Sequence, residues 1–144
     1  LLLDAGQTDA AVREFEQAAK LVPDAPPLRL EVVRGLLDAG KPDAALVHVE
    51  WLAAQLPDEL PVMVNHGRVL SALGKTKEAI ARFDAALAKD PGLQAAHVYK
   101  VEALVAGKQC KAAKQAYAAL EKQLPDQPDH RALVKARAFL DRCK

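Results

Sequence analysis

Apolar residues follow a helical spacing along the whole chain. Val32, Leu36 and Leu37 share one face of a helix, and Ala45 and Val49 lie one turn apart on the next. No segment alternates apolar and polar residues with a period of two, as a half-buried strand would. The pattern therefore predicts an all-α protein.

The chain also repeats itself with a period of 34 residues. Four prolines, Pro23, Pro57, Pro91 and Pro125, are each spaced by 34 residues and each lie in a similar five-residue segment: KLVPD, AQLPD, AKDPG and KQLPD. In the same register an alanine precedes a large residue by four positions, in the pairs Ala11 and Phe15, Ala45 and Val49, Ala79 and Phe83, and Ala113 and Tyr117. A fixed period of this length indicates stacked copies of one supersecondary unit.

Each unit is expected to hold two helices, separated by a glycine and ended by a proline. Gly6, Gly40 and Gly74 share the period, whereas Gly107 comes one residue early, so we expect an altered last turn. Helices are predicted over residues 8–21, 27–39, 42–55, 61–73, 76–89, 94–106, 110–123 and 129–143. Proline is expected in the first helical turn at Pro27, Pro42, Pro61 and Pro128, where its missing N–H costs nothing.

This 34-residue pattern resembles the tetratricopeptide repeat over essentially the whole chain. Gly67 lies in the family's small-residue position of the first helix, and Ala79 and Ala86 lie in the two small positions of the second. Val33 and Val101 depart from the pattern at the equivalents of Gly67. The resemblance implies a right-handed α-solenoid of antiparallel helix pairs. The units would be a partial repeat over 1–25, full repeats over 26–59, 60–93 and 94–127, and a capping helix over 128–144.

Composition narrows the function classes without choosing one. A formal charge of +1 and 51% hydrophobic residues argue against a disordered tail and against a strongly basic nucleic-acid binder. No run approaches the roughly 20 apolar residues of a membrane-spanning helix. The charge is uneven, since residues 1–107 carry a net −4 and residues 108–144 a net +5. A solvated basic surface and a contact for an acidic partner both fit that asymmetry.

No group of residues in the sequence suggests catalysis, a cofactor or a metal. Gly74, Lys75 and Thr76 match the end of a phosphate-binding loop, but Val69 replaces its first glycine. The histidines do not have metal-ligand spacing, and Ser71, the only serine, has no evident general base. We therefore expect a noncatalytic protein with no cofactor and no bound metal.

The resemblance places a partner-binding groove on the inner side of the solenoid, lined by the first helix of each pair. Apolar side chains and two arginines there would suit an extended or helical peptide with apolar anchors and an acidic group. A solvated surface with no ligand remains the alternative. The predicted partner-binding residues are Leu30, Arg34, Val64, Asn65, Arg68, Val98, Tyr99 and Glu102.

The two cysteines favour a disulfide once the repeat geometry is assumed. Equivalent helices of successive repeats run side by side, so the end of the capping helix would bring Cys143 beside Cys110. Two unrelated free thiols are the alternative. A bridge would imply an oxidising compartment, for which we expect the periplasm or the inner face of an outer membrane. A cytoplasmic location stays open.

The leading functional hypothesis is an adaptor or scaffold that binds a peptide or protein segment as part of a larger complex, such as an envelope secretion or assembly complex. The alternative is a structural spacer or self-association module of a longer protein, with a homo-oligomer formed through an apolar face at Leu1 to Ala5. The chain begins at Leu1 without methionine, so a preceding signal peptide or domain stays open as well.

Overall fold

The protein folds as a series of helices with no strand among the residues that the structure describes. The structure is a computed structural model, and it describes residues 5–21 and 25–143. The helices are α1 (Ala5–Leu21), α2 (Pro26–Asp38), α3 (Pro42–Gln55), α4 (Leu60–Ala72), α5 (Thr76–Lys89), α6 (Gln94–Ala106), α7 (Cys110–Gln123) and α8 (Arg131–Leu140). Most of the predicted ranges agree with these bounds to within one residue.

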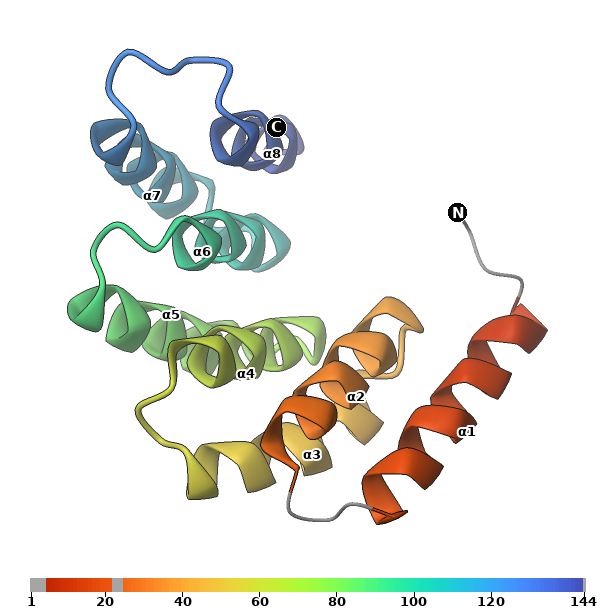
Figure 1. Cartoon of the computed structure of the whole chain (residues 1–144). Coiled ribbons are helices and arrows are strands. Elements are labelled where there is room, and N and C mark those ends of the chain that lie inside the picture. Colours follow the sequence, from red (N-terminus) through yellow and green to blue (C-terminus); the bar gives the residue numbers. More distant parts are fainter. Residues whose placement is uncertain (1–4, 22–24, 144) are drawn as a thin grey trace.

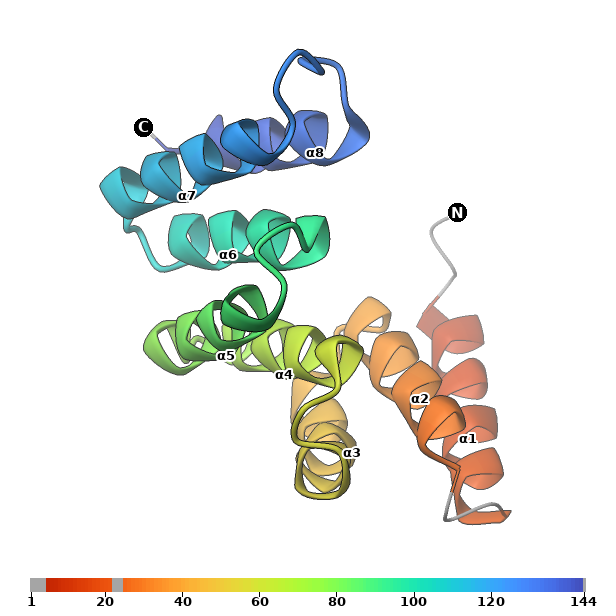
Figure 2. The ribbon, with the colours of Figure 1, turned by 60° about the vertical axis from the view of Figure 1, so that its left-hand side comes forward.

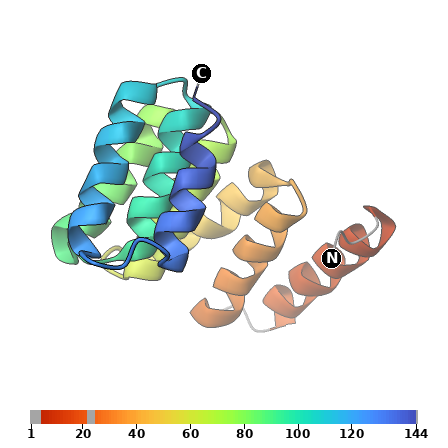
Figure 3. The same ribbon diagram turned by 90° about the horizontal axis from the view of Figure 1, so that it is seen from above.

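The helices form two curved layers. Figure 1 shows α3, α5 and α7 along the outer side of the stack and α2, α4, α6 and α8 along the inner side. Each helix packs on its neighbours in sequence, and α2, α4, α6 and α8 also pack on one another in order. Seen from another side, the pairs α4 and α5, then α6 and α7, lie in successive levels, while α2 and α3 turn away (Figure 2). This is the predicted α-solenoid, and from above α6, α7 and α8 lie side by side at its carboxyl end (Figure 3).

The turns inside the three complete pairs share one geometry. Gly40 and Gly74 have φ angles of 70° and 75°, and Lys108 occupies the equivalent position with φ 60°. In each turn the next amide donates to the carbonyl oxygen five residues earlier, at 2.8 to 2.9 Å, which caps the preceding helix. The expectation of an altered last turn was therefore wrong for its backbone, because Lys108 adopts the left-handed conformation that Gly40 and Gly74 adopt in the other two turns. At Gly107, one residue earlier, a Cβ would lie 2.7 Å from Thr76 Cγ2 at the start of α5.

The core confirms the register of the small and large positions. Ala79, Phe83 and Ala86 of α5 are fully buried. A Cβ at Gly67 would lie 2.6 Å from Phe83 Cε1, so the ring occupies the space that a side chain at 67 would need. Glycine on α4 and phenylalanine on α5 thus fix the closest approach of this pair.

The amino-terminal helix differs from the prediction. Gly6 was expected in an inter-helix turn, but it lies in the first turn of α1, which begins at Ala5. The prediction was wrong here because a glycine at the periodic position lowers helix propensity but does not by itself end a helix. Pro23 of the periodic proline series, and residues Leu1 to Asp4 of the predicted apolar face, lie outside the described residues.

The last helix is shorter than predicted. It begins at Arg131, so the expectation that Pro128 starts it was wrong. Asp126 in the preceding loop has a φ of 64°. The backbone of His130 is extended, and its side-chain Nδ1 accepts a hydrogen bond from the Ala132 amide at 3.2 Å. His130 therefore caps α8.

Candidate partner-binding groove

The inner face carries a hollow between the first halves of α4 and α6. Its volume is about 300 Å³, at the lower end of the range for ligand pockets. Apolar residues, two arginines and one tyrosine line it, with no carboxylate among the lining side chains. The lining residues are Arg34, Leu60, Pro61, Val64, Asn65, Arg68, Leu93, Ala95 and Tyr99.

A second inner hollow continues the first toward the carboxyl ends of α4 and α6. Its volume is about 370 Å³, and it is lined by Leu37, Arg68, Ser71, Ala72, Phe83, Tyr99, Glu102 and Ala106. Arg68 and Tyr99 line both hollows. We call the two hollows together the inner groove, with Arg68 and Tyr99 at its centre.

A separate hollow of about 550 Å³ lies among α5, α6 and α7 and shares no lining residue with the inner groove. Lys77, Lys100 and small residues of α7 such as Ala112 and Ala116 line it. Lys100 is already paired with Asp84, at 2.6 Å, which offsets its charge. Its lining contains no arginine and no aromatic side chain, unlike that of the inner groove.

Arg68 is held in place from two sides. Its guanidinium carbon lies 4.4 Å from the centre of the Tyr99 ring, a cation–π contact between α4 and α6. Its Nη1 donates to Asn65 Oδ1 at 3.2 Å, while Asn65 Nδ2 donates to the Pro61 carbonyl oxygen at 2.8 Å. Asn65 is only 4% exposed. Asn65 therefore positions Arg68 and offers a ligand little surface of its own.

The charge of the groove is concentrated in its first half. Arg34 and Arg68, predicted as a basic pair, both line the first hollow. Arg34 also donates to Glu31 of its own helix, and both side chains stay substantially exposed, so solvent weakens this pair. Glu102 lines the second hollow. An acidic ligand group would be favoured in the first hollow over the second.

Three predicted apolar contacts offer a partner little surface. Val98 is 4% exposed and shares a buried cluster with Leu133 and Ala136 of α8. Val64 is 6% exposed, and only its edge lines the first hollow. Leu30 packs against the core of the first pair and lines neither inner hollow. The repeat register placed these residues on the inner helices, but it did not show how closely α8 covers α6.

Lys135 of α8 was not predicted as a groove residue. Its Nζ lies 3.3 Å from Tyr99 Oη and 4.8 Å from the centre of the same ring. Its repeat equivalents are Gly67 and Val101, both buried, so the period gave no sign of a charged residue reaching Tyr99. Tyr99 is thus contacted by one cation from α4 and another from α8.

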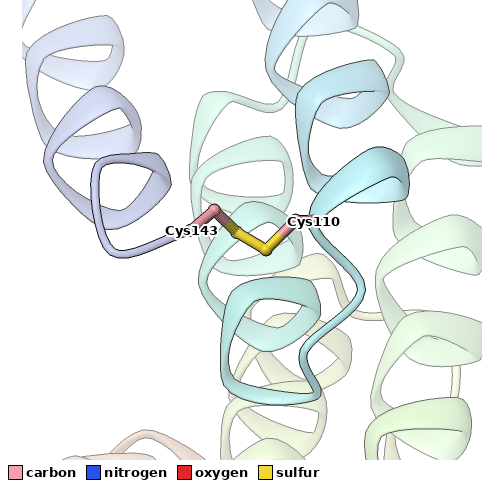
Figure 4. The surroundings of a disulfide bond; sticks show 2 residues. All are labelled: Cys110 and Cys143. Atoms are coloured by element: carbon pink, nitrogen blue, oxygen red, sulfur yellow. A yellow bond between two sulfur atoms is a disulfide. The ribbon is translucent and has the colours of Figure 1, made fainter.

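The capping helix is fixed at its far end by a disulfide. Cys110 and Cys143 are joined, with their Cα atoms 5.6 Å apart and a sequence separation of 33 (Figure 4). Arg137 donates to Tyr117 Oη from Nε at 3.2 Å and from Nη2 at 3.0 Å, which ties α8 to α7. That hydrogen bonding also raises the pKa of Arg137 above its ordinary value.

Across the described ranges, no three His, Cys, Asp or Glu side chains gather in a way that could hold a metal ion. Among these same residues, no helix combines the length and the apolar character needed to cross a bilayer.

Antiparallel helix pairs of 34 residues, stacked in one orientation along an inner groove, define an α-solenoid repeat protein. The sequence pattern of the tetratricopeptide repeat matches residues 2–65 and 70–140. The chain belongs to the tetratricopeptide repeat family.

Solved structures share this fold at low sequence identity. YrrB, described as a TPR protein with an unusual peptide-binding site, is 20% identical over 92% of this chain and 67% of its own, with a TM-score of 0.74. TTC0263, a thermophilic TPR protein in Thermus thermophilus, is 23% identical over 95% of this chain and 76% of its own, with a TM-score of 0.72. MamA is 15% identical over 96% of this chain and 87% of its own, with a TM-score of 0.70. No curated protein sequence matches the chain.

Proposed function

We propose that this protein is a noncatalytic adaptor whose inner groove binds an extended or helical segment of another protein. The observation that carries the proposal is the pair of adjoining hollows that share Arg68 and Tyr99. Membership of a family whose members are generally interaction modules supports it. So does the description of the structurally similar YrrB as a protein with a peptide-binding site.

The groove favours a segment with an acidic group beside apolar side chains. Arg34 and Arg68 supply positive charge to the first hollow, and Leu60, Pro61 and Leu93 supply apolar surface next to it. A carboxylate that pairs with Arg68 would gain more than an exposed pair does, because Asn65 and Tyr99 already hold the guanidinium and little ordering remains.

Affinity capture tests this proposal. The variant Arg34→Glu, Arg68→Glu, Tyr99→Ala should lose partners that the wild type retains. A matched control, Arg82→Glu with Lys122→Glu, reverses two exposed charges on the outer helices α5 and α7. A partner list that is the same for the wild type and the groove variant would remove the groove from the proposal.

We place the protein in an oxidising compartment, the periplasm or the inner face of an outer membrane, within a larger envelope complex. The Cys110–Cys143 bridge supports this location, because disulfides persist where thiols are not kept reduced. Alkylation of intact cells with a thiol reagent tests it. Two modified cysteines in the native protein would favour the cytoplasm instead.

A further inference from the structure

Both tyrosines of the chain are contacted by basic residues of α8. Lys135 contacts Tyr99 on α6, and Arg137 contacts Tyr117 on α7. Tyr117 is buried, whereas Tyr99 lines the groove. One of these contacts therefore secures the helix, and the other brings a positive charge to the place where a ligand would lie.

The position of Lys135 depends on how α8 is held. The helix has ten residues, fewer than a helix needs to be stable by itself in water. Its buried residues are Ala132, Leu133 and Ala136, and Phe139 and Leu140 near its end pack against the same cluster while staying partly exposed. The disulfide fixes the chain just after α8 to the first residue of α7, as Figure 4 shows. Removing the bridge would let the last turns of α8 separate from α6 and α7.

We propose that Lys135 is a specificity-determining residue of the groove for acidic ligands, and that the Cys110–Cys143 bridge is its positioning element. The inference rests on the proposed function, because Lys135 contacts Tyr99 at the centre of the inner groove. Arg68 and Lys135 lie 4.4 and 4.8 Å from the centre of the Tyr99 ring, so both positive charges attract an anionic ligand side chain that binds beside this ring. Acidic ligands thus bind more tightly when the bridge is closed.

A dithiol opens the Cys110–Cys143 bridge by thiol–disulfide exchange. The reductant supplies two electrons and two protons, the Sγ–Sγ bond breaks, and Cys110 and Cys143 each become a thiol. The dithiol is oxidised to its own disulfide. Dithiothreitol serves as this reagent in the test.

The first measurement follows the two tyrosines by NMR with ring-labelled tyrosine. Lys135→Ala should shift the signals of Tyr99 and leave those of Tyr117 in place. The variant Cys110→Ser, Cys143→Ser, or wild type treated with dithiothreitol, should shift the Tyr99 signals in the same direction. Unchanged Tyr99 signals after reduction would overturn the positioning role of the bridge.

The second measurement is binding of a labelled oligoglutamate peptide, with oligoglutamine of equal length as the neutral control. Lys135→Ala should weaken oligoglutamate binding about two- to fivefold, and Lys135→Arg should restore it. Opening the bridge should cause a similar loss in the wild type and no further loss in Lys135→Ala. Arg131→Ala, which removes another exposed cation of α8, is the matched control.

The outcomes separate this inference from the proposed function. If Arg34→Glu, Arg68→Glu, Tyr99→Ala abolishes oligoglutamate binding while Lys135→Ala and Arg131→Ala act alike, the groove stands and the role of Lys135 falls. If oligoglutamate does not bind the wild type, or binds it no better than oligoglutamine, the acidic preference falls and the inference falls with it.

Discussion

The two ends of the solenoid hold their terminal helices in different ways. Within the described part of the chain, α1 packs on α2 alone, Phe15 remains 37% exposed, and an exposed ion pair joins Asp9 to Lys41. At the other end, α8 packs on both α6 and α7, is joined by a disulfide, and donates hydrogen bonds to Tyr99 and Tyr117. A helix at the end of a stack lacks a neighbour on one side. A covalent bond and the part-buried hydrogen bonds from Arg137 to Tyr117 offset that missing packing at the carboxyl end, whereas an exposed ion pair contributes little at the amino-terminal end.

The largest difference should appear between two phenylalanines in the same repeat position. Phe83→Ala leaves a cavity in a fully buried site and should lower the free energy of unfolding by about 3 to 5 kcal/mol. Phe15→Ala should cost less than half as much, because its ring is already partly in water. Urea unfolding of both variants measures this, and equal losses would contradict the comparison.

Removal of the disulfide should have the next largest effect. The variant Cys110→Ser, Cys143→Ser should lose about 3 to 4 kcal/mol in the chain-entropy description of a bridge spanning this many residues. Hydrogen exchange should show the loss first in α8 and not in α1. Thiol titration of unreduced wild type should find no reactive thiol, and two titratable thiols would defeat this part of the account.

Two glycines, Gly67 and Gly35, face these phenylalanines. An added Cβ at Gly67 meets the Phe83 ring at 2.6 Å, whereas one at Gly35 meets the Phe15 ring at 3.2 Å. Gly67→Ala should therefore destabilise the protein by about 1 to 3 kcal/mol, since the buried ring has nowhere to move. Gly35→Ala should be nearly neutral, because the partly exposed ring can shift. Thermal unfolding that ranks the two variants in the opposite order would contradict this difference between the two ends.

The left-handed position of the turns gives a smaller effect of opposite sign. Lys108→Gly should stabilise the protein by about 1 kcal/mol, because glycine adopts this φ without steric cost. Gly74→Ala, at the equivalent position one repeat earlier, should destabilise it by a similar amount. Urea unfolding of the two variants decides, and a destabilising Lys108→Gly would mean that the lysine side chain has a role of its own.

The smallest effect concerns pH. Burial lowers the pKa of His48 and of His66, and nearby arginines lower both further. Because the pKa values of these histidines are lower in the folded protein than in the unfolded chain, the unfolded chain binds protons at a higher pH. The free energy of unfolding should therefore fall as the pH drops below about 6.5. The variant His48→Gln, His66→Gln should show a weaker dependence in unfolding measurements between about pH 5 and pH 7. An unchanged pH profile would exclude these histidines as its cause.

The features that follow from the repeat geometry could be predicted from the sequence, whereas those that depend on local contacts at the ends of the solenoid could not. The 34-residue period predicted the helix pairs, the small position at Gly67 and the inner position of Arg34, Arg68 and Tyr99, because each follows from packing that recurs. The ends do not recur. The start of α8 depends on a local cap at His130, and the burial of Val98 depends on how far α8 lies over α6. The approach of Lys135 to Tyr99 follows from the same placement.

The most direct test of the account is hydrogen exchange of the protein with a captured partner. We expect slower exchange in the inner helices α2, α4 and α6, centred on Arg68 and Tyr99, with little change in α3 and α5. Protection confined to the outer helices, with the inner groove unchanged, would contradict the claim that this groove is the binding surface.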